Sequence, residues 1–226
     1  VGSEMCIRDR FHLDGQQSRR YFQDFRMNRG RVQLDAAIAY TLREEQARAV
    51  RDTKTYYQSH PGGEYLWNAK PRFGKTLSVY DFCKQVDAQT VLIVTNRPAI
   101  ANSWYSDYVR FLGRESGYLF VSHVDALAGQ PHVLDEQGYL DAAAQGEKLY
   151  KRIEFVSLQD MKGSKYFGGE YDKLRHLTEL NWDVLVIDEA HEGVDTYKTD
   201  LAFDRIRHKF CLLYTSPSPR DRSLSR

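Results

Sequence analysis

Residues 69–76 read Ala-Lys-Pro-Arg-Phe-Gly-Lys-Thr, and they join a short strand candidate, Glu64–Asn68, to a helix candidate, Gly74–Val86. A strand, a glycine-containing turn and a helix in this order form the context that a phosphate-binding loop requires. Backbone N–H groups at the start of a helix lack partners, and the helix dipole favours negative charge there. The stretch therefore predicts a site for a phosphorylated ligand.

The residue types in this loop suit ATP and Mg²⁺. Lys75 is expected on the β- and γ-phosphates, and the Thr76 hydroxyl is expected to bind Mg²⁺. Gly74 lets the backbone approach the phosphates without an intervening side chain. The alternative is an ordinary strand, turn and helix with a chance Gly-Lys-Thr. The predicted nucleotide contacts in the loop are Ala69, Lys70, Pro71, Arg72, Phe73, Gly74, Lys75 and Thr76.

A second motif lies at the end of an apolar run, where residues 183–191 read DVLVIDEAH. The run VLVI is typical of a strand buried on both faces, and an α/β sheet places its ligands at the carboxyl ends of its strands. Asp188 is expected to hold Mg²⁺, and Glu189 is expected to orient and deprotonate the attacking water. The alternative is a solvated acidic loop after a core strand.

Alternating strand and helix patterns predict an α/β fold with a mainly parallel sheet flanked by helices. The segment 124–150 mixes Gly, Pro and short helical pieces, and it reads as a surface insertion. Further helices are predicted over 42–59, 98–112, 171–180 and 201–208, and further strands over 90–95, 118–122, 153–157 and 184–187.

Composition excludes more than it identifies. The chain has 226 residues and a formal net charge of +1, so a nucleic-acid partner would need a local basic patch. No apolar run approaches the roughly 18–20 residues that span a bilayer, and the first residues lack the apolar core of a secretory signal. These patterns predict a cytoplasmic protein with no membrane partner.

The two ends of the chain match each other through DNA. One coding strand compatible with residues 1–9, VGSEMCIRD, has a reverse complement that translates as CLLYTSPSP, which is residues 211–219. Nine consecutive residues disfavour chance, so residues 1–10 and 211–226 are interpreted as translated adapter. We then expect the lobe to be truncated, without its last strand and the coupling motif after it.

Outside these ends, few metal ligands are indicated. Cys83 is the one remaining cysteine, which makes neither a disulfide nor a thiolate site. The histidines show no ligand spacing, so no metal is assigned to His123, His132, His176 and His208. For the tryptophans, core packing is favoured over base stacking at Trp67, Trp104 and Trp182.

With both motifs placed, the chain resembles the superfamily 2 DEAD/DEAH-box helicases, and most of all the ATPase (Res) subunits of type III and type I restriction enzymes. The resemblance covers about 40–210 and implies an incomplete RecA-like lobe over 41–210, preceded by a helical lead-in, 11–40. Residues 42–50, LREEQARAV, are similar to a glutamine motif. By that match Gln46 would read the adenine edge, although an amphipathic helix with an incidental glutamine is the alternative. The resemblance also places His191 near the γ-phosphate.

The resemblance extends to a nucleic-acid surface. Residues 95–98, TNRP, and 157–159, SLQ, are similar to the segments with which this family grips one strand. It implies contacts to phosphate and sugar, and plain loop capping is the alternative for each residue. The predicted contacts are Thr95, Arg97, Ser157 and Gln159.

The function that the resemblance implies is a nucleic-acid-dependent ATPase that translocates on or unwinds a polymer, with DNA favoured over RNA. Its implied partners are a second RecA-like lobe with an arginine finger, missing from this chain, and nuclease or methyltransferase subunits. The chain by itself is therefore expected to turn over ATP poorly. Two alternatives remain: a non-catalytic nucleotide-sensing module that binds nucleic acid, and an ATPase of another P-loop class that acts on protein.

Overall fold

The computed structural model describes residues 39–70, 72–96, 98–113, 116–145, 150–188 and 203–215. All of them lie in the second of two compact units, which comprises residues 36–226. The predicted lead-in over 11–40 and the segments 1–10 and 216–226 lie almost wholly outside the described ranges. Among the described helices, none combines the length and apolarity that a membrane crossing needs.

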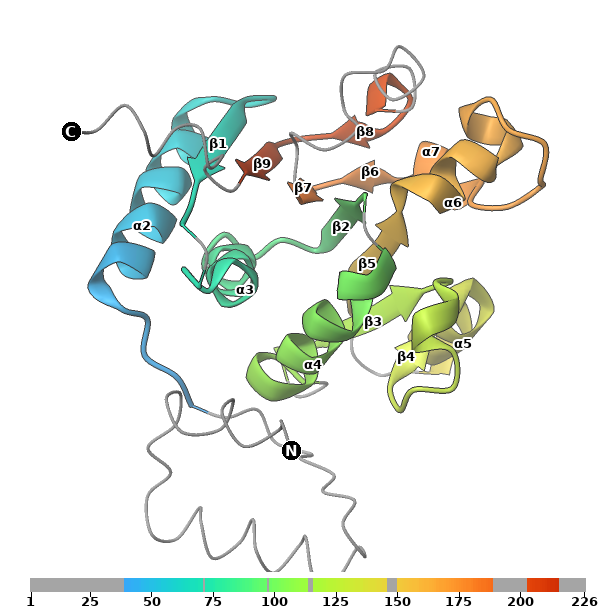
Figure 1. The fold of residues 1–226 in the computed structure, drawn as a ribbon, viewed down its shortest axis with the longest axis horizontal. Helices are drawn as coiled ribbons and strands as arrows, with labels where there is room; N and C mark the ends of the chain where they lie inside the picture. Colours follow the sequence, from blue (N-terminus) through green and yellow to red (C-terminus); the bar gives the residue numbers. More distant parts are fainter. Residues whose placement is uncertain are drawn as a thin grey trace, which may run out of the picture. The chain divides into compact units, whose positions relative to one another are not determined.

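A seven-stranded sheet organises this unit, with the strand order β1-β9-β7-β2-β5-β3-β4 (Figure 1). Every pairing of neighbours is parallel. This confirms the predicted α/β class, because parallel neighbours require crossover connections that the helices provide. The strands are β1 (Glu64–Asn68), β2 (Thr90–Thr95), β3 (Tyr118–Ser122), β4 (Val133–Leu134), β5 (Lys151–Ser157), β7 (Val184–Asp188) and β9 (Cys211–Thr215).

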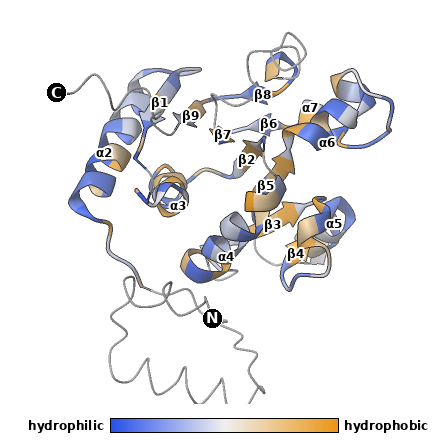
Figure 2. Cartoon of the chain, viewed as in Figure 1, coloured by the Kyte–Doolittle hydropathy of each residue, from blue (hydrophilic) through white to orange (hydrophobic). Residues whose placement is uncertain are grey.

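Helices cover both faces of the sheet and bury its apolar side chains. On one face Val91, Ile93 and Phe155 belong to the core that includes residues of α2, α3 and α4. On the other, Leu92 and Val94 pack in a core with residues of α6 and α7. Figure 2 shows the apolar colour concentrated on the central strands. The helices are α2 (Glu44–Ser59), α3 (Lys75–Gln85), α4 (Ala101–Phe111), α5 (Glu136–Gln145), α6 (Leu158–Gly163) and α7 (His176–Glu179).

The strand expected to be missing is present. β9 runs between β1 and β7, with Leu212 opposite Tyr65 on one side and Val186 on the other. Its side chains alternate between the two cores, since Leu212 and Tyr214 face one and Cys211 faces the other. The expectation of an unfilled position in the sheet was therefore wrong. Whatever the origin of its coding sequence, CLLYT is an apolar run that suits a strand buried on both faces.

Three further expectations change. Residues 124–150 are not only a surface insertion, because β4 pairs with β3 and extends the sheet. The predicted helix over 171–180 shrinks to α7, one turn long. Of the helix predicted over 201–208, the described part keeps Phe203 and Asp204 as helical, whereas Arg207–His208 form β8, which pairs with β6 (Asn181–Trp182). Leu174 has a φ of 60°, a left-handed backbone that interrupts a helix over 171–180. Short 3₁₀ turns complete the fold at Pro98–Ile100, Asp125–Leu127 and Lys165–Phe167.

Asp183 ties the starts of two central strands together. Its Oδ2 accepts backbone N–H bonds from Gln89 at 2.6 Å and Thr90 at 3.2 Å, just where β2 begins. Its Oδ1 accepts a bond from Lys209 Nζ at 2.7 Å, next to β9. Burial raises the pKa of Asp183, but the bonds from Lys209, Gln89 and Thr90 outweigh it and leave this pKa below its ordinary value.

We predict that Asp183→Asn lowers the free energy of unfolding by about 1–3 kcal/mol at pH 7, the cost of losing hydrogen bonds to a charged, mostly buried group. Because the folded-state pKa is depressed, the carboxylate stabilises the fold above its unfolded pKa of about 3.9, and this stabilisation is lost as the pH falls through the folded value. Denaturant unfolding at pH 7 and at acid pH measures both effects.

Asp87→Asn is the matched control. Asp87 also pairs with a lysine, Lys151, but its side chain is 74% exposed. An exposed ion pair contributes little to the free energy of unfolding, so the value for this variant should stay within about 1 kcal/mol of that of the native protein. Equal losses in the two variants, or a loss at Asp183 that does not shrink in acid, would contradict the role assigned to Asp183.

Candidate nucleotide site at the carboxyl edge of the sheet

The parallel register aligns the two sequence motifs at one edge. Thr95, the last residue of β2, lies opposite Asp188 of β7 and opposite Ser157 of β5. Asp188 in turn lies opposite Tyr214 of β9. Asn68 ends β1 opposite Thr215, so the loop 69–76 starts from this same edge. Residues that are distant in sequence therefore meet where an α/β fold places its ligands.

The loop turns into α3 through Gly74, which has a φ of 82°. That left-handed backbone is open to glycine and strained for other residues. Close approach adds a second requirement, because a Cβ at this position would lie 2.4 Å from Gln46 Nε2. Gly74 is thus needed for the turn itself and for the contact with α2.

Gln46 connects α2 to the loop. Its Nε2 donates to the carbonyl of Phe73 at 2.7 Å, and its Oε1 accepts the backbone N–H of Arg43 at 2.9 Å. The Arg43 guanidinium donates to the carbonyls of Arg72 and Phe73. Each end of the Gln46 amide thus has a partner within the protein, and adenine recognition by Gln46 stays a prediction that would use the amide's second acceptor or donor position.

Aromatic side chains support the charged groups at this edge. Lys75 Nζ lies 4.7 Å from the centroid of the Tyr214 ring, a cation–π distance. Trp104 Nε1 donates to Asp188 Oδ2 at 3.0 Å, and the Trp104 and Tyr214 rings stack with centroids 6.3 Å apart. Asp188 is itself buried, with a relative exposure of 6%. The indole therefore fixes the orientation of a carboxylate that has been withdrawn from water.

Sequence reasoning did not find these two supports. Core packing is the role expected for the three tryptophans, and Trp104, Trp67 and Trp182 are all buried. The hydrogen bond from Trp104 to Asp188 spans 84 residues, and no local pattern indicates it. Tyr214 lies in the segment that was set aside as adapter.

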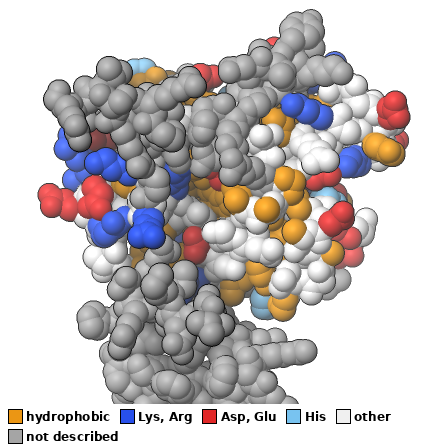
Figure 3. All heavy atoms as spheres, viewed as in Figure 1, with side chains coloured by type: hydrophobic (Ala, Val, Ile, Leu, Met, Phe, Trp, Pro, Cys, Tyr) orange, Lys and Arg blue, Asp and Glu red, His pale blue; other side chains and the backbone are white. Residues whose placement is uncertain are grey.

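A cavity of about 680 Å³ adjoins the loop and contains Lys70, Arg72 and Phe73 among its lining residues. Its other walls include Trp67 from β1 and Arg43, which precedes α2. Charges of both signs surround it: Arg48 lies 3.7 Å from Asp52. Figure 3 likewise shows Lys, Arg, Asp and Glu side chains interspersed beside α2. Its size suits a small-molecule ligand.

The donor groups of the edge fit a nucleotide with Mg²⁺. A carboxylate and a hydroxyl are oxygen ligands of the kind that Mg²⁺ prefers, and Asp188 and Thr76 are those groups. The backbone N–H groups at the start of α3, with the dipole of an 11-residue helix behind them, suit phosphate oxygens. Pro71, Glu189 and His191 lie outside the described residues.

The predicted nucleic-acid contacts differ in exposure. Gln159 is exposed at the start of α6, whereas Thr95 and Ser157 are each 1% exposed. The Ser157 hydroxyl caps α6 by accepting the backbone N–H of Asp160 at 3.0 Å. Capping, the alternative considered from sequence, therefore accounts for Ser157, while Arg97 lies outside the described residues.

Sequence comparison supports the same class of protein. The family model described as "Type III restriction enzyme, res subunit" matches residues 39–216. A Mycoplasma pneumoniae protein, described as the C-terminus of an inferred type II restriction enzyme and methyltransferase, is 30% identical over 176 residues. The alignment covers 75% of this chain and 22% of that protein.

Three solved structures share the fold at low sequence identity. The SWI2/SNF2 ATPase core of Sulfolobus solfataricus in complex with dsDNA has a TM-score of 0.54 at 15% identity, over 84% of this chain and 35% of that one. The type ISP restriction-modification enzyme LlaGI has a TM-score of 0.53 at 13% sequence identity, over 78% of this chain and 17% of that one. The UvsW helicase of bacteriophage T4 has a TM-score of 0.50 at 14% sequence identity, over 88% of this chain and 61% of that one. The chain thus spans less than two thirds of each of these relatives.

Fold and edge together define a RecA-like lobe of the superfamily 2 helicase kind. The chain belongs to the family of type III restriction enzyme Res subunits, whose model matches most of its length.

We predict that Gly74→Ala destabilises the protein more than Gly129→Ala does. Both glycines have positive φ, 82° and 74°, so both variants incur the strain of about 1–2 kcal/mol for a left-handed residue. A Cβ at Gly129 meets nothing within 4 Å, whereas one at Gly74 collides with Gln46. Denaturant unfolding of the two variants measures the difference. Equal losses would show that the contact with Gln46 imposes no constraint.

Proposed function

We propose that this chain is the ATP-binding and ATP-hydrolysing lobe of a DNA-dependent translocase or helicase, the motor of a restriction system. The observation that carries the proposal is the alignment of the phosphate loop with Asp188 at one edge of a parallel sheet. Membership of the Res-subunit family agrees with this reading.

The described residues divide the work of nucleotide binding. The N–H groups at the start of α3 and the Lys75 ammonium would hold the phosphates, while Gln46 holds the loop through the Phe73 carbonyl. Thr76 and Asp188 would hold Mg²⁺, whose charge lowers the cost of the negative charge that develops during phosphoryl transfer. Trp104 keeps the Asp188 carboxylate aimed at that position. Glu189, next in sequence, would orient and deprotonate the attacking water.

DNA is the polymer that the relatives favour. The Sulfolobus ATPase core is in complex with dsDNA, and the LlaGI structure holds a DNA substrate mimic. The Mycoplasma relative is described as a restriction enzyme and methyltransferase, which supports a methyltransferase as partner activity. Gln159, exposed in the first turn of α6, is the described residue best placed to touch the sugar–phosphate backbone. Arg97, predicted from the same resemblance, is proposed for the same role, whereas Thr95 and Ser157 are buried and Ser157 caps α6.

Two substitutions in the full-length protein test the proposal. Lys75→Ala should abolish ATP binding, because it removes the cation from the β- and γ-phosphates. Glu189→Gln should keep ATP binding and lose polynucleotide-stimulated turnover, because it removes the base alone. Binding is measured with a fluorescent ATP analogue, and turnover by phosphate release with and without DNA. Stimulation by neither DNA nor RNA would refute the motor, and unchanged turnover in Glu189→Gln would refute the assigned base.

A further substitution tests the support for Asp188. Trp104→Phe keeps an aromatic ring in the core but removes the N–H that bonds Asp188 Oδ2. A hydrogen bond to a charged group contributes about 1.5–3 kcal/mol, so the Mg²⁺ concentration for half-maximal turnover should rise roughly 10–100-fold. Trp182→Phe is the control, because the Trp182 N–H bonds the Leu177 carbonyl instead. Equal Mg²⁺ requirements in both variants would contradict the role of Trp104.

A further inference from the structure

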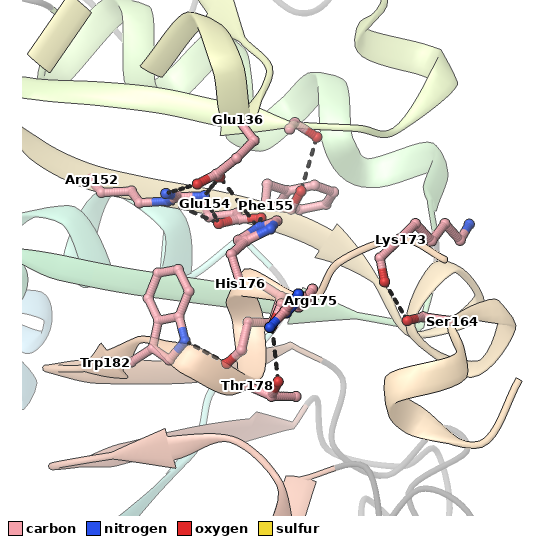
Figure 4. A network of polar contacts seen from close by, with 12 residues as sticks. Glu136, Arg152, Glu154, Phe155, Ser164, Lys173, Arg175, His176, Thr178 and Trp182 are labelled. Carbon is pink, nitrogen blue, oxygen red and sulfur yellow. Dashed lines mark hydrogen bonds and ion pairs between the residues drawn. The ribbon is translucent and has the colours of Figure 1, made fainter. Parts of the chain in front are cut away.

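On the sheet face that α7 covers, charged side chains of three elements form a buried network. Arg152 of β5 bonds the Glu154 carboxylate, with Nε 2.9 Å and Nη2 2.6 Å from Oε2. The same guanidinium pairs with Glu136 of α5. Arg152 is 2% exposed and Glu154 is fully buried. Figure 4 shows these side chains converging on His176 of α7.

The two oxygens of Glu154 have different partners. Oε2 faces Arg152, while Oε1 lies 2.7 Å from His176 Nε2. Glu136 Oε2 also lies 3.5 Å from that nitrogen. Two carboxylates thus face one guanidinium, and the surplus negative charge is directed at the His176 ring. A cation beside the ring would balance that charge, although Glu136, whose side chain is 29% exposed, is also partly solvated.

His123 completes the group from a third direction. It follows β3 and is exposed, and its ring lies 5.9 Å from that of His176 between centroids. One ligand atom each from His123, Glu154 and His176 all lie within 4.8 Å of one another. Ligands of a tetrahedral Zn²⁺ ion, each about 2.0–2.2 Å from the metal, are separated by roughly 3.3–3.5 Å. The distances between the three ligand atoms, from 2.7 Å for Glu154 and His176 up to at most 4.8 Å, include that separation. His123 is exposed and can adjust its rotamer.

Space for further ligands lies alongside. A cavity of about 340 Å³ is lined by His123, Glu136, Asp160, Asp172 and His176 among others. Three protein ligands with an open position are typical of a zinc site that also binds water or a small ligand. The thiols are not part of it, because Cys83 and Cys211 are buried in the cores.

We propose that His123, Glu154 and His176 form a binding site for a divalent transition-metal ion, Zn²⁺ being the best match to two imidazoles and a carboxylate. The ion replaces the proton between His176 and Glu154, and the surplus charge of Glu136 favours it further. It would join β5, α7 and the segment after β3. The site is distinct from the Mg²⁺ position proposed at Asp188, which has oxygen ligands.

The test is Zn²⁺ titration of the metal-stripped full chain by calorimetry, with excess Mg²⁺ present to fill oxygen sites. Native protein should bind about one equivalent, and Co²⁺ in its place should give visible d–d absorption bands. His123→Ala should weaken Zn²⁺ binding at least about 10–100-fold, since even second-shell changes have effects of that size. Because His123 is exposed and outside the ion-pair network, circular dichroism should show an unchanged fold.

His60→Ala is the matched control, an exposed histidine at the end of α2 that should leave Zn²⁺ affinity unchanged. Asp188→Asn should also leave it unchanged, which separates this site from the nucleotide site. The proposal is overturned if native protein takes up no Zn²⁺, if His123→Ala binds as tightly as native, or if His60→Ala loses as much affinity as His123→Ala.

Discussion

The parallel register of β2 with β7 and β5 is the constraint on which the rest of the site depends. It places Thr95 beside both Asp188 and Ser157, and through β9 it brings the start of the phosphate loop to the same edge. A slip of one residue would turn Asp188 to the opposite face and move each apolar side chain of β7 into the other core, where it does not fit. The apolar residues buried on both faces of β2 and β7 make such a slip costly, so core packing holds the chemistry in place.

Around that edge, hydrogen bonds from polar side chains hold the loop and the Asp188 carboxylate in place. Gln46 and Arg43 bond the carbonyls of the loop, and Trp104 bonds the carboxylate of Asp188. These groups are pre-organised, which lowers the cost of ordering charges when a ligand binds. The His123–Glu154–His176 group follows the same logic on the α7 side of the sheet: a buried carboxylate is held by an arginine and directed at one imidazole.

Much of the fold was predictable, and the misses have physical causes. β2 was predicted to the residue because an apolar, β-branched run bounded by turns specifies a strand locally. α7 is shorter than the predicted helix and β8 was not predicted, because short segments have little intrinsic preference and take the structure that packing imposes. β9 was missed because a match in the coding DNA outweighed an apolar pattern that, judged as protein alone, reads as a buried strand.

By itself the sequence determined the class of fold and the candidate nucleotide residues, since the phosphate loop and the acidic strand end are contiguous motifs whose chemistry follows from adjacent residues. Only the tertiary structure decided which side chains support these residues. Trp104 bonds Asp188, Gln46 bonds the loop, and His123 lies close to Glu154 and His176. Those partners lie tens of residues apart. Their proximity arises from strand order and helix packing, which local spacing does not encode.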